Sequence, residues 1–194
     1  MDSVKTPARR PSRDEVRERI LWAARKMFAD RGFAGASIDD IAAAAGFTKG
    51  AVYSNFRTKD ELFFALLDGE IAARIELIRQ GTADLRSMGD QLTEAMAAGR
   101  DWQLLFTDYW QRAMRDEAVR ERFVAHRRRL RAAIAEQVQA MVDRAEAPSA
   151  VAASSLMFTV LALSNGLAIE ELMDPGSTPP ELMGQVLSAL VAGD

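Results

Sequence analysis

The spacing of hydrophobic residues along the chain predicts helices and shows no sustained strand pattern. Ile20, Ala24 and Phe28 recur at intervals of four residues. This spacing places the three side chains on one face of a helix, which we predict over residues 13–30 with Gly32 as its end. The pattern favours an all-α fold.

Two shorter helices are predicted after a glycine-rich connection. Ser37 is a suitable N-cap for the first, and Gly46 ends it. Thr48 can cap the second, whose apolar positions are Val52 and Phe56. Two short helices joined by a tight, glycine-containing turn are typical of a helix-turn-helix, whose second helix enters the major groove of DNA.

The second of these helices contains a glycine where a better helix former is expected. Glycine costs roughly 1 kcal/mol relative to alanine inside a helix. At about 100° per residue, Val52 and Phe56 share the buried face, and Gly50 and Ser54 lie opposite them. Without a Cβ, Gly50 allows the helix backbone to approach a groove closely.

The residues around this glycine suit contact with phosphate. Thr48 and Lys49 lie at the helix N-terminus, where free N–H groups and the helix dipole favour an anion. Tyr53 is expected at the edge of the outward face. Lys59 is expected in the first turn of the following helix, where a nearby phosphate would offset its unfavourable position in the dipole.

Composition narrows the choice of function. The chain of 194 residues has a net charge of −3, no cysteine and one histidine. Residues 1–60 hold twelve Lys and Arg against eight Asp and Glu, whereas the remainder holds thirteen against twenty. A basic first third suits a polyanionic partner, and the lack of cysteine favours a reducing cytoplasm. Because no GxSxG, Walker or HExxH motif occurs, we expect neither an enzyme nor a bound metal or cofactor.

The run GFAGASIDDIAAAAGFTKGAVYSNFRTKDELFFALL, residues 32–67, resembles the DNA-binding domain of the TetR family of bacterial transcriptional regulators. The resemblance implies an all-α homodimer of about nine helices. Residues 13–57 would form a three-helix DNA-binding domain, and residues 58–194 a domain for effector binding and dimerisation. Residues 1–12 are expected to be a disordered basic tail; the alternative is an arm, extending to Arg13, that reaches a minor groove.

The resemblance also implies which residues meet DNA. Phosphate contacts would fall on Ser37, Thr48, Tyr53 and Lys59. The groove-facing residues would be Lys49, Gly50, Ala51 and Ser54, with Ala51 placed to touch a thymine methyl group. Each side chain also has a plainer explanation, because the two hydroxyl residues at positions 37 and 48 can act only as N-caps, the tyrosine can be a packing residue and the lysine at 59 a solvated charge.

A stripe of aromatic residues marks the helix predicted after residue 100. Such a stripe is ordinarily core, but the resemblance implies a small-molecule cavity here, which aromatic walls with a few polar groups would suit. For His126, a hydrogen-bonded structural role is the alternative to ligand contact. The arginines at 127–129 and 131 are expected on a solvated helix face, and the alternative is that they form a second anion site. The candidate ligand-binding residues are Trp102, Phe106, Tyr109, Trp110, Phe123, His126, Phe158 and Asn165.

No charged residue occurs from Ala147 to Ile169, a stretch long enough to span a bilayer. Its several hydroxyl and amide residues, and the lack of a flanking basic cluster, favour a buried or interface helix instead of a membrane span. The resemblance implies that this helix and the last one pair with their symmetry mates in a four-helix bundle. The predicted dimer residues are Leu156, Thr159, Leu163, Leu167, Leu182, Val186 and Leu190.

The prediction for function is a ligand-responsive, DNA-binding transcriptional regulator. In its simplest form it is a repressor that a largely apolar small molecule releases from a near-palindromic operator in double-stranded DNA. The alternative is a helical DNA-binding or interaction protein without an effector. A cavity on the order of several hundred Å³ in the C-terminal domain would favour the first reading.

Overall fold

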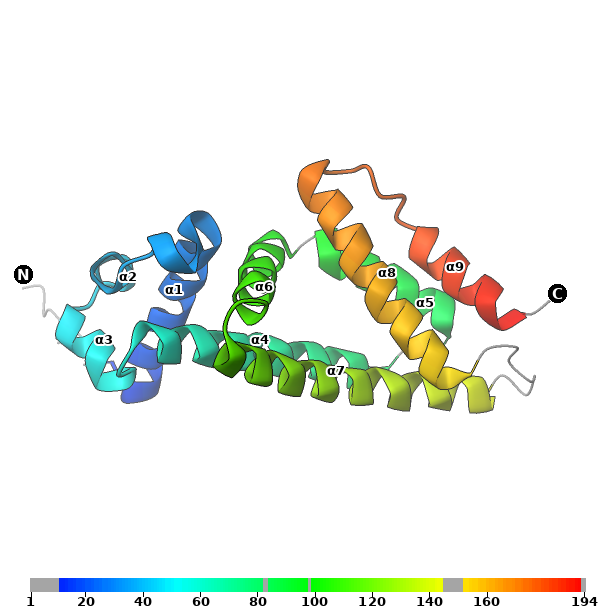
Figure 1. Ribbon diagram of the computed structural model, residues 1–194, viewed down its shortest axis with the longest axis horizontal. Helices are drawn as coiled ribbons and strands as arrows, with labels where there is room; N and C mark the ends of the chain where they lie inside the picture. The colour runs from blue at the N-terminus through cyan, green and yellow to red at the C-terminus, as the bar shows by residue number, and fades with distance from the viewer. Residues whose placement is uncertain (1–10, 82–83, 98, 145–151, 193–194) are drawn as a thin grey trace, which may run out of the picture. The chain divides into compact units, whose positions relative to one another are not determined.

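The computed structural model describes residues 11–81, 84–97, 99–144 and 152–192, and within them the chain is all-α, with no strand (Figure 1). This confirms the predicted fold class. Of the predicted basic tail at residues 1–12, the first ten residues lie outside the described part. The helices are α1 (Arg13–Gly35), α2 (Ile38–Ala45), α3 (Lys49–Asn55), α4 (Lys59–Gln80), α5 (Leu85–Ala97), α6 (Arg100–Ala113), α7 (Glu117–Arg144), α8 (Ala153–Met173) and α9 (Leu182–Ala192).

The chain divides into two compact units, with the boundary between Leu66 and Leu67 inside α4. In the N-terminal unit, α1 begins with a capping box in which Ser12 and Glu15 satisfy each other's backbone N–H groups. Gly32 interrupts α1 with a φ of 68°, but helical backbone resumes as far as Gly35. The predicted end of this helix is therefore too early, because one more turn follows the glycine.

Both short helices begin where the sequence predicts and α2 ends at Gly46 as expected, but α3 ends at Asn55, one residue before Phe56. Ser37 Oγ accepts a hydrogen bond from the backbone N–H of Asp40, and Thr48 Oγ1 accepts one from that of Ala51. Gly46 ends α2 in the left-handed region, with a φ of 74°, which glycine adopts without a steric penalty. The caps at both ends fix the turn that sets α3 against α2.

The C-terminal unit is held together by a core shared by α5, α7, α8 and α9. Figure 1 shows α5, α8 and α9 side by side. The crossing of α5 and α9 is close, because a Cβ on Gly89 would overlap the backbone nitrogen of Gly184. Only glycine at both positions allows the two backbones to touch.

Helix α8 is the one helix in the described part of the chain that is long and apolar enough to cross a membrane on composition alone. Its completely buried Leu156 and its neighbours Val160 and Leu161 pack into the core of the C-terminal unit. Phe158 and Met173 on the same helix are exposed, at 55% and 78%. One face of α8 therefore belongs to the core, and another leaves apolar side chains at the surface.

Candidate DNA-binding surface and effector cavity

The outward face of α3 is composed as the helical wheel predicts. Val52 is completely buried and Phe56, which follows the helix, is 1% exposed. Gly50 and Ser54 are exposed, and the Tyr53 ring is 45% exposed. The surface of α3 is therefore free of large side chains at its centre and has a phenol at its edge.

Nothing inside the protein requires a glycine at position 50. A Cβ added there would have Thr48 Oγ1 as its nearest neighbour, at 3.8 Å, which is ordinary van der Waals contact. The backbone of Gly50 is helical, so an alanine would be favoured by roughly 1 kcal/mol. Packing within the protein does not explain the glycine, which agrees with the predicted close approach of a partner to this part of α3.

Lys49 is exposed, and its Nζ lies 2.9 Å from Oδ2 of Asp39 on α2. The hydrogen bond and the negative charge of Asp39 raise the pKa of the Lys49 ammonium. Both side chains are more than half exposed, so water weakens the pair. A phosphate can therefore replace Asp39 as the partner of Lys49 at small cost.

Lys59 is half-buried and closes the C-terminal end of α1. Its Nζ donates to the carbonyl oxygens of Phe33 at 2.7 Å and Ala36 at 3.0 Å, and it lies 4.4 Å from the centroid of the Phe33 ring. The reading of this side chain as a purely solvated charge is wrong. The contact of Lys59 with phosphate stays a prediction. Its structural role at the end of α1 was not indicated by the sequence.

The other predicted contact residues keep their hydroxyl groups accessible. Ser37 and Thr48 cap their helices, yet both are exposed. Ser54 Oγ donates to the carbonyl oxygen of Ala51 at 2.8 Å, and Ala51 itself is half-buried. Capping therefore explains two of the hydroxyl residues without excluding a phosphate contact.

The C-terminal unit contains a partly enclosed cavity of about 100 Å³, lined by residues of α4 to α8. Of the predicted ligand-binding residues, Trp102, Phe106 and Asn165 line it. Ligand pockets usually measure roughly 300–1,000 Å³, so this cavity is too small for a drug-sized molecule. The volume expected for an effector site is not present in this conformation.

The other five candidates do not line the cavity. Tyr109 is completely buried in the core and His126 is 7% exposed. Phe123 packs between the rings of Phe106 and Tyr109, at centroid distances of 5.8 and 5.1 Å. Trp110 and Phe158 are exposed, at 43% and 55%. The surroundings of Tyr109 are those of a core residue, and the surroundings of His126 are those of a buried, hydrogen-bonded structural residue.

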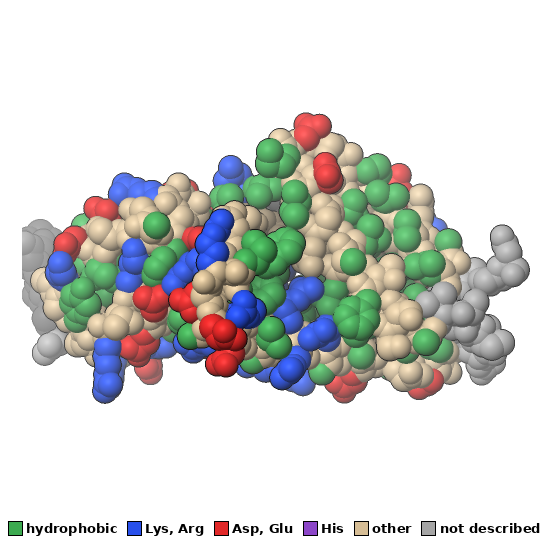
Figure 2. All heavy atoms as spheres, viewed as in Figure 1, with side chains coloured by type: hydrophobic (Ala, Val, Ile, Leu, Met, Phe, Trp, Pro, Cys, Tyr) green, Lys and Arg blue, Asp and Glu red, His purple; other side chains and the backbone are tan. Residues whose placement is uncertain are grey.

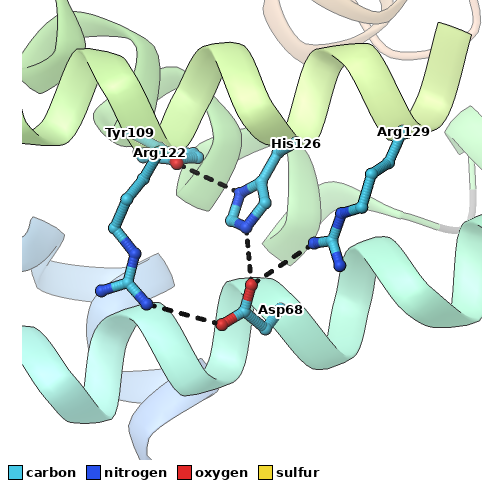
Figure 3. A network of polar contacts seen from close by, with 5 residues as sticks. All are labelled: Asp68, Tyr109, Arg122, His126 and Arg129. Carbon is cyan, nitrogen blue, oxygen red and sulfur yellow. Dashed lines mark hydrogen bonds and ion pairs between the residues drawn. The ribbon is translucent and has the colours of Figure 1, made fainter.

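Figure 3 shows a polar network of five residues, Asp68 from α4, Tyr109 from α6, and Arg122, His126 and Arg129 from α7. His126 Nε2 lies 2.6 Å from Oδ1 of Asp68, and its Nδ1 lies 3.1 Å from the Tyr109 hydroxyl. Arg122 and Arg129 approach the same carboxylate, at 3.7 and 3.5 Å. Because Asp68 can only accept, Nε2 carries the proton, and the Tyr109 hydroxyl donates to Nδ1 of a neutral imidazole.

The pKa values of the two buried members agree with this arrangement. Burial lowers the pKa of His126 from its ordinary value, although the hydrogen bond to Asp68 opposes that shift. Burial also raises the pKa of the Tyr109 phenol. Both groups are therefore neutral near pH 7.

Several polar residues of the cavity were missed by the sequence reading. The expectation that Arg127 lies on a solvated face is wrong, because its side chain is half-buried and lines the cavity. Arg127 lies three residues before Leu130, a spacing that places both on one helix face, and this could have indicated its burial. A run of arginines, however, usually indicates a solvated surface. The polar lining residues are Arg74, Gln103, Arg127, Ser164 and Asn165.

A larger depression, of about 590 Å³, lies on the surface beside α5 and the α8–α9 connection. It is open to solvent, and its lining includes the carboxylates of Asp90, Glu94, Glu171 and Glu181. Mutual repulsion of four acids and free access to water make it a poor site for an apolar effector. We therefore place the candidate effector site in the smaller cavity.

Most of the predicted dimer residues leave part of their surface accessible. Thr159, Leu163 and Leu167 on α8 are half-buried, as are Leu182, Val186 and Leu190 on α9. The prediction of Leu156 as an interface residue is wrong, because its side chain is completely buried within its own protomer and cannot contact a second copy. In the view of Figure 2, hydrophobic side chains are scattered over the region of α8 and α9.

Two family models match the chain. The model described as bacterial regulatory proteins, tetR family, matches residues 20–66, and the model described as BetI-type transcriptional repressor, C-terminal, matches residues 81–193. Together they cover both compact units.

Curated relatives are similar over part of their length. The transcriptional repressor AcnR of Corynebacterium diphtheriae is 29% identical over 123 residues, which are 63% of each chain. The transcriptional activator FasR of Mycolicibacterium smegmatis is 34% identical over 90 residues, 46% of this chain and 41% of its own. The matched region thus spans less than two thirds of either relative.

Solved structures are similar over nearly the whole chain. A transcriptional regulator from Pseudomonas aeruginosa PAO1 has a TM-score of 0.77 at 20% identity and covers 95% of this chain and 92% of its own. A regulator from Saccharomonospora viridis in complex with choline has a TM-score of 0.74 at 22% identity, covering 93% and 97%. The regulator FadR of Bacillus subtilis in complex with stearoyl-CoA has a TM-score of 0.74 at 15% identity, covering 91% and 98%. At these identities the likeness concerns the fold.

Proposed function

The chain belongs to the TetR family of bacterial transcriptional regulators, with a C-terminal region of BetI type, and from this membership we propose a specific function. It binds operator DNA as a homodimer, with α3 in the major groove. The observation that supports this most strongly is Gly50, which is exposed in the first turn of α3 and has no packing role within the protein.

In the proposed complex, Gly50 and Ala51 lie closest to the bases, and Lys49 and Ser54 reach the groove beside them. Ser37, Thr48, Tyr53 and Lys59 contact phosphates and fix the position of α3. Ser37 and Thr48 cap α2 and α3, Lys59 is the first residue of α4, and Tyr53 lies in the second turn of α3. The backbone contacts supply most of the affinity, and the groove contacts supply the specificity.

Homodimerisation through α8 and α9 would place two copies of α3 on one face of DNA. The exposed apolar side chains of Phe158, Ile169 and Met173 support a partner surface on α8. A two-fold dimer requires a near-palindromic operator, with half-sites about 34–36 Å apart or a multiple of that distance. The protein then acts in the cytoplasm, where it has access to DNA.

A small molecule in the cavity would control DNA binding by stabilising one spacing of the two α3 helices. To change the ratio of the DNA-binding to the non-binding conformation from 99:1 to 1:99, the effector must bind the non-binding conformation more tightly by about 5.5 kcal/mol. Release of a repressor is the simplest form of this control. The relatives include both a repressor and an activator, and the solved neighbours hold chemically different ligands, so neither sign nor effector follows from similarity.

The small volume of the cavity favours a second candidate, a DNA-binding regulator that needs no effector. The two candidates differ in whether any small molecule changes the affinity for DNA. Both require sequence-specific binding, which selection from a library of random duplexes tests directly. Enrichment of one inverted repeat supports the proposal, and failure of the folded, dimeric protein to enrich any sequence would overturn it.

A further inference from the structure

The polar groups in the cavity are cationic or neutral. Arg74 and Arg127 line it together with two amides and one hydroxyl, and the lining contains no acidic residue among the described side chains. A second cavity of about 30 Å³ shares Ile78, Leu92 and Val160 with the first, and no charged residue lines it. The first cavity is thus partly cationic, and the second is largely apolar, with Gln91 as its one polar side chain among the described residues.

The aromatic faces near the cavity are already covered by cations. The guanidinium carbon of Arg74 lies 4.3 Å from the centroid of the Trp102 ring, and that of Arg127 lies 6.0 Å from the centroid of Phe106. A cationic ligand needs open aromatic faces and is repelled by nearby guanidinium groups. The arrangement therefore disfavours amines and quaternary ammonium compounds.

The charge of Arg127 is incompletely compensated within the described part of the chain. Burial, and the neighbouring charge of Arg131, lower the pKa of the Arg127 guanidinium, and no carboxylate opposes that shift. A half-buried cation of this kind gains most from an anion that forms two parallel hydrogen bonds. The unpaired amide groups of Gln103 and Asn165 can complete the coordination of such an anion, because neither side chain makes a hydrogen bond within the described residues.

We infer that the cavity binds a small monocarboxylate with an apolar body, whose carboxylate pairs with Arg127 and whose body lies against Ile78, Leu92 and Val160. This inference rests on the proposed effector-controlled function and gives it a ligand class. A space of about 100 Å³ with a 30 Å³ extension limits the body to a short aliphatic chain or one aromatic ring. Larger acids require the helices to separate.

Calorimetric titration of the full-length protein with benzoate, benzyl alcohol and benzylamine tests the charge requirement without any mutation. The three probes share one ring and differ in charge; hexanoate, hexan-1-ol and hexylamine form the matching aliphatic set. We expect a carboxylate of at least one set to bind about tenfold or more tightly than its alcohol and amine. Binding of an amine or alcohol as tight as that of its acid, or binding of no probe, would overturn the inference.

Two variants then locate the anion. Arg127→Gln should weaken carboxylate binding by about tenfold, while Arg128→Gln, one residue further along α7 and exposed, should leave it within about twofold. Equal effects of the two variants would contradict the role of Arg127. Titration of the selected DNA site on the same samples separates the two proposals. DNA binding without carboxylate binding contradicts only this inference, and carboxylate binding without DNA binding contradicts only the regulator.

Discussion

Asp68 on α4 and His126 on α7 are joined by a hydrogen bond of 2.6 Å between Oδ1 and Nε2. Asp68 is the second residue of the C-terminal unit and belongs to α4, the helix that begins in the N-terminal unit. Tyr109 holds the other side of the imidazole, and Tyr109 packs on Phe123, which packs on the cavity residue Phe106. The start of α4 in this unit is thus in continuous contact with the wall of the cavity.

The first prediction concerns pH and His126, the single histidine of the chain. Its pKa is lowered in the folded protein, so the unfolded chain binds a proton first as the pH falls. The free energy of unfolding should keep its full value above pH 6.5. It should decrease as the pH falls from 6.5 to the lower pKa that His126 has in the folded protein. Thermal unfolding measured between pH 7.5 and 5 checks this. The His126→Gln variant should lose most of the pH dependence in that window; an unchanged dependence would contradict the assignment.

The second prediction concerns Gly50. Gly50→Ala should leave the free protein as stable as before, or more stable by up to about 1 kcal/mol, because the added Cβ meets only ordinary contacts. The same methyl group should weaken operator binding by about tenfold or more, since it holds α3 away from the groove. Gly69→Ala is the control, because Gly69 is an exposed helical glycine of α4 with no atom near its Cβ position. If the Gly50→Ala variant binds DNA as tightly as the wild type, Gly50 does not lie against the floor of the groove.

The third prediction separates two roles of lysine. Lys59→Ala should lower the free energy of unfolding by about 1–3 kcal/mol, because the part-buried carbonyl groups of Phe33 and Ala36, at the end of α1, lose a charged donor. Lys49→Ala removes only an exposed pair and should change stability by less than about 0.5 kcal/mol. Urea denaturation of the two variants distinguishes these cases. Both variants should lower the salt slope of DNA binding by about one, and a slope that stays at the wild-type value would exclude that lysine from the phosphate contacts.

The fourth prediction concerns the crossing of α5 and α9. Gly89→Ala should destabilise the protein by about 3 kcal/mol or more, because the new Cβ meets rigid backbone of Gly184 and not a movable side chain. Gly69→Ala again serves as the control, with an expected small gain. Chemical denaturation of both variants measures the difference. Equal stabilities would mean that the two helices separate at little cost.

The helix-turn-helix could be predicted from sequence because its determinants are local. Ser37, Gly46 and Thr48 act on neighbours within a few residues, and Val52 and Phe56 set the buried face by spacing alone. A wheel calculation therefore identified the exposed side of α3 without any knowledge of the rest of the chain.

The cavity could not be predicted in the same way, because it depends on contacts between distant segments. Arg127 belongs to a run of arginines that reads as solvated, and only the packing of α4 to α8 brings it inside. Leu156 has the spacing of an interface residue and lies in the core instead. Helix α5 was not identified from its hydrophobic pattern, and the contact between Gly89 and Gly184 joins positions far apart in the chain.

We expect two α3 helices to occupy successive major grooves of one operator. Dimethyl sulfate footprinting of the full-length protein on the selected DNA site tests it most directly, because the reagent methylates guanine N7 in the major groove. Two bound helices should protect two patches of guanines, related by a two-fold axis and separated by about one helical turn or a multiple of it. A single patch, or bound DNA whose guanines all remain reactive, would contradict it.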